Sequence, residues 1–93
     1  MSFKAGDKVK WESQAGGVSL EKVGTIVIVV PPNTWIRSVN NASAILATSN
    51  AEAIDNTRAS RKAESYVVQV ESANRRARPK LYWPVAKRLT LVP

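Results

Sequence analysis

The stretch that decides the fold is residues 75–92, RRARPKLYWPVAKRLTLV, which joins a basic cluster, an aromatic pair and a short alternating apolar run. Pro84 lies in its middle and cannot donate a hydrogen bond to a β-ladder, so a strand over residues 80–83 has to end there. A tight helical turn is then expected before residues 88–92 form a closing strand. The stretch therefore predicts two short strands joined by a single turn.

The aromatic pair divides between the two faces of its strand. Successive side chains of a strand point to opposite sides, so Tyr82 and Trp83 do not share a face. We expect Trp83 to lie on the inward face with Leu81, and two later leucines to complete the seam that closes the sheet, Leu89 and Leu91. Tyr82 is then left as an exposed ring.

Alternation of polar and apolar residues predicts two further strands with one buried face each. In residues 8–12 (KVKWE), Trp11 falls on the inward face. In residues 64–72 (ESYVVQVES), which alternate most clearly, Tyr66 falls on the inward face. Both aromatic side chains are therefore expected to belong to the core.

A long strand is expected over residues 19–30, after a turn at residues 13–17. Its last part, residues 26–30 (IVIVV), is apolar on both faces, which is typical of burial on both sides. An interior glycine often marks a bulge or a bend, so Gly24 is expected to let one strand serve both halves of a small barrel.

Residues 33–63 differ from the rest and are interpreted as an insertion between the second and third strands. Residues 41–58 (NASAILATSNAEAIDNTR) are rich in alanine, and Asn40 or Asn41 could cap a helix there. The apolar residues do not follow a clear helical period, and large apolar side chains are few. The insertion is therefore expected to be helical or partly disordered.

The composition limits the chemistry that this chain could carry. A chain of 93 residues is expected to form a single domain, residues 1–93. It contains no cysteine and no histidine, which removes thiolate chemistry, the commonest general base and the commonest metal ligand. We therefore expect no enzymatic activity, no cofactor, no metal and no small-molecule substrate. The longest apolar run is too short to cross a bilayer, so a cytoplasmic protein is expected, without a membrane partner.

The excess positive charge lies in the last third of the chain. The net charge is +7. Residues 1–57 carry five basic and five acidic side chains, whereas residues 58–93 carry nine basic and two acidic ones. Such asymmetry favours an anionic partner, DNA or RNA or an acidic protein surface. The alternative is a basic surface that serves solubility alone.

Five short strands with one insertion resemble the SH3-like small β-barrels, most closely the Tudor-like and KOW-like domains of bacterial proteins. The segments that carry the resemblance are residues 6–11 (GDKVKW), 24–27 (GTIV), 66–70 (YVVQV) and 89–91 (LTL). The resemblance implies an all-β, five-stranded barrel. The sequence departs from the compact Tudor-like pattern in the insertion at residues 33–63, between the second and third strands.

The candidate nucleic-acid-binding residues combine cations with an aromatic ring. Phosphates require several cations along a surface, and unstacked bases require flat rings to stack upon. The residues that meet this description are Arg75, Arg76, Arg78, Lys80, Tyr82, Lys87 and Arg88. The sequence therefore predicts an accessory domain that binds the phosphate backbone with little sequence specificity.

A second interpretation is a protein-interaction adaptor or inhibitor, possibly encoded on a mobile element, that docks on an acidic partner surface. Trp35 follows two prolines in an irregular region, where packing alone does not explain a large aromatic side chain. The expected partner-binding residues are Trp35, Arg58, Arg61 and Lys62. A monomer or a weak homo-oligomer, paired through exposed strand edges, fits either interpretation.

Overall fold

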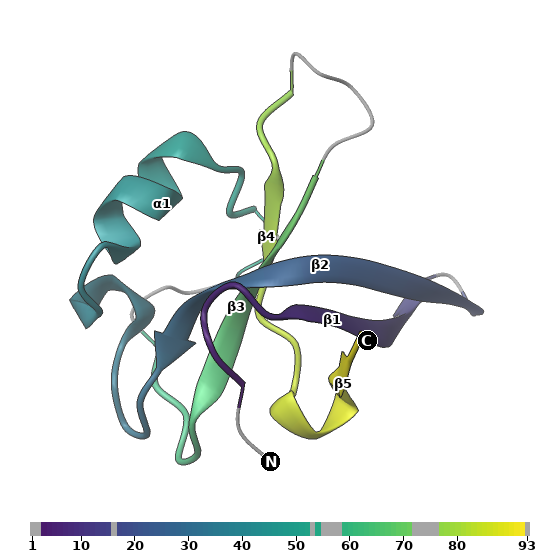
Figure 1. Ribbon diagram of the computed structural model, residues 1–93, viewed down its shortest axis with the longest axis horizontal. Coiled ribbons are helices and arrows are strands. Elements are labelled where there is room, and N and C mark those ends of the chain that lie inside the picture. Colours follow the sequence, from purple (N-terminus) through teal and green to yellow (C-terminus); the bar gives the residue numbers. More distant parts are fainter. Residues whose placement is uncertain (1–2, 16, 53, 55–58, 72–76, 93) are drawn as a thin grey trace.

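The computed structural model describes residues 3–15, 17–52, 54, 59–71 and 77–92. They form a five-stranded antiparallel sheet with one helix and two 3-10 turns (Figure 1). In chain order the elements are β1 (Lys8–Ala15), β2 (Val18–Val30), η1 (Ile36–Ser38), α1 (Ala42–Thr48), β3 (Ser65–Val70), β4 (Lys80–Tyr82), η2 (Ala86–Arg88) and β5 (Thr90–Leu91). The predicted all-β architecture with a helical insertion after the second strand is confirmed.

The strands follow the order β4-β3-β2-β1-β5. The two outer strands are not paired with each other among the described residues, so the sheet is open where a closed barrel was expected. The turn expected at residues 13–17 begins later than predicted, because β1 continues to Ala15 and pairs there with Val18. The predicted helical turn after Pro84 is confirmed as η2.

The long strand β2 connects the two halves of the sheet. It pairs with β1 up to Thr25 and with β3 from Thr25 onward. Gly24 lies at this crossing, where an added Cβ would stand 2.6 Å from the carbonyl oxygen of Gln69. The irregularity in register lies further along, between Ile26 and Ile28. Glycine is therefore required at residue 24 because β3 approaches the backbone closely, while the bulge itself follows it.

Each face of the sheet has its own hydrophobic cluster. Trp11, Tyr66 and Leu89 belong to the cluster on one face, where the prediction that Trp11 and Tyr66 are core residues is confirmed. The other face is covered by the insertion, and its cluster is made of Ile28, Val30, Ile36, Ala42, Ile54, Val67 and Leu81. Alternating strands with two buried faces explain why the IVIVV segment of β2 is apolar throughout.

The expected seam of four residues is wrong, because its members lie on different faces. Leu81 is fully buried and Trp83 packs beside it, both against the insertion side of the sheet. Leu89 belongs to the opposite cluster, and Leu91 is 49% exposed on the edge strand β5. The expectation that Leu81 and Trp83 share a face is confirmed.

The alanine-rich stretch of the insertion forms a short helix at its beginning, as the helical alternative predicted. α1 ends at Thr48, ten residues before the end of the alanine-rich stretch. Asn41 occupies the N-cap position of the helix, as predicted, but in a left-handed conformation with φ 70° and without a side-chain capping hydrogen bond. Asn50 then pairs with the outer edge of β4, accepting from the Leu81 N–H at 2.8 Å and donating to the Pro79 carbonyl at 2.8 Å. The insertion therefore covers both a face and an edge of the sheet.

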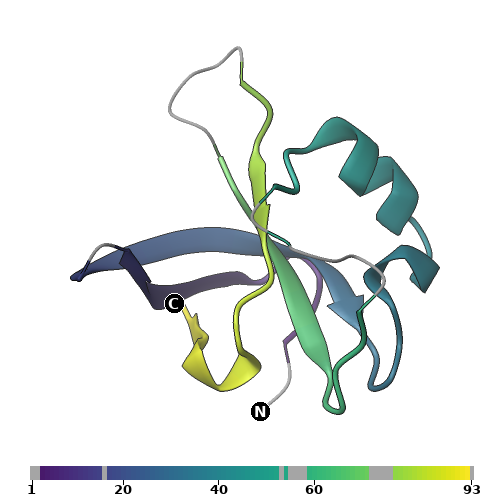
Figure 2. The same cartoon turned by 180° about the vertical axis from the view of Figure 1, so that it is seen from behind.

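Figures 1 and 2 show the insertion at one end of the molecule and the tip of the β1–β2 hairpin at the other. Within the described residues, no helix is long and apolar enough to cross a membrane. The surface that remains uncovered by the insertion is the face of β1, β2 and β4 that carries Trp11 and Tyr82.

Candidate nucleic-acid interface

A lysine and two aromatic rings meet on the face opposite the insertion. Tyr82 is half-buried on β4, and its ring stands edge-on to the Trp11 ring with 5.9 Å between centroids. The ammonium of Lys22 lies 4.7 Å from the Tyr82 centroid. Lys80 is two residues before Tyr82 on the same strand, so its exposed side chain leaves β4 on the same face. We call Trp11, Lys22, Lys80 and Tyr82 the cation–aromatic face.

Strand register explains how this face is assembled. Trp11 pairs with Lys22 across β1 and β2, so both side chains project on the same side of the hairpin. Tyr82 pairs with Val68 on β3, which places its ring over the same hydrophobic cluster as Trp11. The strands β1, β2 and β4 therefore bring Trp11 and Lys22 next to residues that follow them by 58 to 71 positions in the chain.

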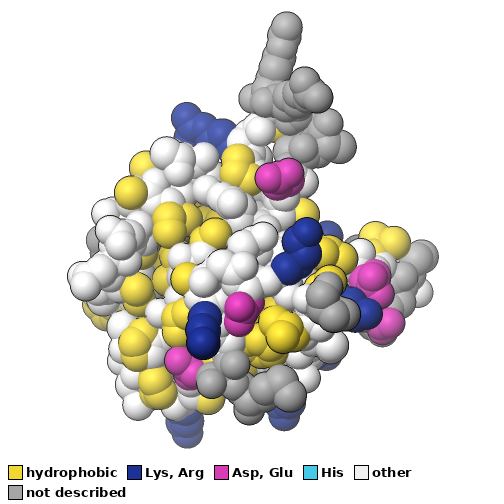
Figure 3. Space-filling view, in the orientation of Figure 1, with side chains coloured by type: hydrophobic (Ala, Val, Ile, Leu, Met, Phe, Trp, Pro, Cys, Tyr) yellow, Lys and Arg dark blue, Asp and Glu magenta, His cyan; other side chains and the backbone are white. Residues whose placement is uncertain are grey.

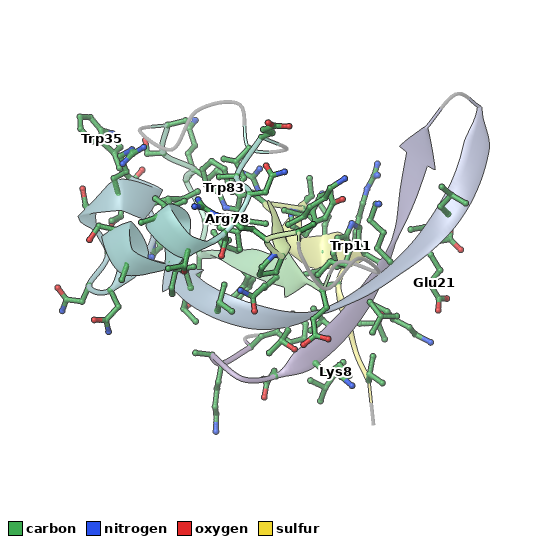
Figure 4. All side chains as sticks on the ribbon, turned by 90° about the horizontal axis from the view of Figure 1, so that it is seen from above. Lys8, Trp11, Glu21, Trp35, Arg78 and Trp83 are labelled. Carbon is green, nitrogen blue, oxygen red and sulfur yellow. The ribbon has the colours of Figure 1, made fainter. Side chains whose placement is uncertain are left out.

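The predicted nucleic-acid-binding residues are only partly gathered in one place. Lys80 and Tyr82 lie on the cation–aromatic face, whereas Arg78 donates to the Ala47 carbonyl at 3.1 Å, at the end of α1 (Figure 4). Lys87 and Arg88 are exposed on η2, which follows the C-terminal end of β4 (Figure 1). Arg75 and Arg76 lie outside the described residues.

Lys22 is the residue that sequence reasoning missed. It lies in the part of the chain where acidic and basic residues balance, so composition gave no reason to select it. The available signal was the alternation of β1 and β2, which would have placed Lys22 opposite Trp11 once the hairpin register was known. Figure 3 shows the Lys and Arg side chains standing apart on this view, with Asp and Glu side chains near several of them.

The predicted partner-binding residues also lie in different environments. Trp35 is 49% exposed and projects from the insertion (Figure 4), and Lys62 is exposed as well. Arg58 lies outside the described residues. Arg61 is turned inward, where its two terminal nitrogens donate to the carbonyls of Trp83 at 2.8 Å and Pro84 at 3.0 Å.

Burial lowers the pKa of the Arg61 guanidinium, because removing a cation from water disfavours its charged form. An arginine remains charged at any physiological pH despite such a shift. Its guanidinium is already engaged by two carbonyls and lies over the Trp83 ring. Arg61 therefore contributes to the attachment of the insertion in this structure.

The side chains that could bind a metal ion do not gather in one place within the described part of the chain. Among the described residues, no group of three or more His, Cys, Asp or Glu side chains could hold a metal ion.

Comparison with protein-family models, with curated proteins and with solved structures finds no match to this chain. The function of the site is therefore inferred from its own geometry and charge.

Proposed function

We propose that the chain is a nucleic-acid-binding domain that contacts single-stranded nucleic acid through the cation–aromatic face. The observation that carries the proposal is the Lys22 ammonium 4.7 Å from the half-buried Tyr82 ring, with Lys80 leaving β4 on the same face. Lysines neutralise phosphates, and an aromatic ring stacks on a base with a gain of roughly 1 to 3 kcal/mol. Neither contact reads base identity, so little sequence specificity is expected.

Binding would require Lys22 to change its contact. In the free protein its ammonium lies over the ring that a base would stack upon. A lysine stem is flexible, so the ammonium can move from the ring to a neighbouring phosphate while the base takes its place. In the sequence, Arg75 and Arg76 fall between β3 and β4. Charge reversal of Arg75, Arg76 and Arg78 tests whether this segment also contributes to nucleic-acid binding.

The test is fluorescence anisotropy with labelled oligothymidylate, duplex DNA and RNA at low and moderate salt. The double variant Lys22→Glu/Lys80→Glu is compared with Lys87→Glu/Arg88→Glu, which changes the charge equally but on η2. The first variant should weaken oligothymidylate binding about tenfold or more, and loss of two phosphate contacts should reduce the salt slope by about 1.4. No binding by the native chain at low salt, or equal losses in both variants, contradicts the proposal.

We also propose that the sheet is that of an SH3-like barrel of the Tudor-like or KOW-like type. The support is the strand order β4-β3-β2-β1-β5 together with a 3-10 turn between the fourth and fifth strands. A bacterial origin and a cytoplasmic location stay predictions from the sequence.

A second candidate function is a protein-interaction adaptor or inhibitor, which the exposure of Trp35 favours. A tryptophan that is 49% exposed beside the short turn η1 is the largest exposed aromatic side chain among the described residues. Tryptophan is enriched where interfaces gain most of their binding energy. An acidic partner surface would complement the exposed cation of Lys62.

A pull-down with the native chain and with Trp35→Ala tests this candidate. A partner that the native chain retains and the variant loses supports it, and Arg37→Ala, which alters an exposed residue of the same turn, serves as the matched control. Unchanged recovery with Trp35→Ala counts against the adaptor function.

A further inference from the structure

A groove lies between the segment that enters β3 and the turn η2. It consists of two adjoining cavities with volumes of about 280 and 460 Å³. Both are lined by Ala63, Glu64, Ala86 and Lys87, so they meet at these four residues. The smaller lobe continues to Arg61, Ser65 and Val85, and the larger one to Phe3, Tyr66 and Leu89. None of the four residues of the cation–aromatic face lines this groove.

The smaller lobe contains a polar atom without a partner. Ser65 is only 2% exposed, and its hydroxyl makes no hydrogen bond among the described residues. A buried hydroxyl that is left unpaired costs stability, so such groups are uncommon unless they serve a ligand or a function. The remaining wall is mainly aliphatic, and at its rim Val85 leaves 47% of its surface in water.

Three charged side chains line the groove. Arg61 already donates to the carbonyls of Trp83 and Pro84, which leaves Glu64 and Lys87, one charge of each sign, to meet a ligand. Glu64 is held in place because one of its oxygens, Oε2, accepts from the Tyr66 hydroxyl at 2.9 Å, and that hydroxyl accepts from the Phe3 N–H at 3.2 Å. Lys87 is exposed on the facing wall. A balanced pair of charges does not select a polyanion, so this groove is not suited to the phosphate backbone. It does complement a group that offers both a donor and an acceptor.

We propose that the groove binds an extended, uncharged peptide segment of a partner protein, with one aliphatic side chain in the smaller lobe. A peptide unit provides an N–H for the Glu64 carboxylate and a carbonyl for the Lys87 ammonium. A side chain of leucine size fits within 280 Å³ against Ala63, Val85 and Ala86. From there the peptide continues toward the larger lobe.

Titration of the full-length, ¹⁵N-labelled chain with the blocked tripeptide acetyl-Ala-Leu-Ala-amide tests the proposal by NMR. The amides of Ser65, Ala86 and Lys87 should shift and saturate, with a dissociation constant on the order of 1 mM. Acetyl-Ala-Asp-Ala-amide, which places a carboxylate in the aliphatic lobe, is the matched control and should give no saturable shift.

Two variants separate binding from folding. Ala63 is exposed, so Ala63→Leu should leave the spectrum of the fold intact, fill the lobe and weaken the tripeptide about tenfold or more. Ser65→Ala removes the unpaired hydroxyl, so it should raise the melting temperature of the free protein and leave the affinity for the tripeptide unchanged. An unchanged affinity in Ala63→Leu overturns the proposal.

The nucleic-acid proposal and the peptide proposal fail independently. Lys22→Glu/Lys80→Glu should keep full affinity for the tripeptide, and Ala63→Leu should keep full affinity for oligothymidylate. Absence of saturable shifts, equal shifts with the Asp control, or shifts of Ser65 by oligothymidylate and not by the tripeptide would each overturn the peptide site.

Discussion

The guanidinium of Arg61 lies 3.8 Å from the centroid of the Trp83 ring while it donates two hydrogen bonds to the backbone carbonyls that follow β4. The same residue accepts from the Asn33 N–H through its own carbonyl, at 2.7 Å. Arg61 thus connects three places, namely the beginning of the insertion, its end, and the strand that passes beneath it. The side chain of Arg61 thus holds the segment after β4, and its main chain holds the beginning of the insertion.

Arg61→Ala should lower the free energy of unfolding by about 2 kcal/mol, because charge-assisted hydrogen bonds and a cation–π contact are lost together. Urea unfolding followed by tryptophan fluorescence measures this change. Lys62→Ala, at the exposed neighbouring position, is the control and should change stability by less than about 0.5 kcal/mol. Arg61→Lys keeps the charge and loses the planar fork, so it should fall between the two. Equal stability of all three variants would contradict this role of Arg61 in attaching the insertion.

Gly24→Ala should destabilise the protein by about 3 kcal/mol, because its new Cβ would meet the Gln69 carbonyl oxygen at 2.6 Å and the Val68 side chain at 2.7 Å. Gly17→Ala provides the comparison. Its Cβ meets nothing within 4 Å, but its φ of +81° is costly for a residue with a side chain, at about 1 kcal/mol. Thermal unfolding of both variants measures the two losses of stability. A smaller loss of stability in Gly24→Ala than in Gly17→Ala would refute the prediction.

The stability of the protein should decline at high pH through Tyr66. Burial raises the pKa of this phenol above its ordinary value of 10.0, and the neighbouring Glu64 carboxylate raises it further, against a lowering effect of the Phe3 backbone bond. The folded state therefore holds the phenolic proton more tightly than the unfolded state. This contribution is complete below the unfolded pKa and is lost as the pH rises through the folded one.

Denaturant unfolding of the native chain and of Tyr66→Phe from pH 8 to pH 11 measures this effect. The phenylalanine variant lacks the titrating group, so its stability should fall less steeply over the upper part of that range, while lysine titration is common to both. A constant difference between the two proteins across the range would show that Tyr66 does not titrate with unfolding.

Truncation of two adjacent residues of the insertion should change the stability of the protein by very different amounts. Ile36 is fully buried against the sheet, so Ile36→Ala should cost about 2 to 5 kcal/mol. Trp35 is 49% exposed, so Trp35→Ala should cost well under 1 kcal/mol in spite of its size. Circular dichroism melts of the two variants decide this. A large loss at Trp35 would make it a packing residue and remove the structural reason for the adaptor function.

Local patterns predicted where the strands lie and the buried side of Trp11 and Tyr66, but not the faces of the C-terminal leucines. Trp11 and Tyr66 lie in alternating segments, and both are core residues because alternation places them on the face of the sheet that carries one of the two apolar clusters. Pro84 correctly placed the end of β4 and the turn η2, since proline has no N–H to offer a ladder. The bounds of α1 were not predicted, because alanine content says little about where tertiary packing ends a helix.

The amino-acid sequence by itself determined the all-β class, the one insertion, and the charge of the C-terminal third, because these depend on neighbouring residues and composition. The tertiary structure alone decided which cations meet an aromatic ring. Lys22 stands over Tyr82 and Arg61 over Trp83 because of strand register and the return of the insertion, which are contacts between residues far apart in the chain. The same non-local pairing separates Lys80 from Lys87 and divides the basic stretch between two different surfaces.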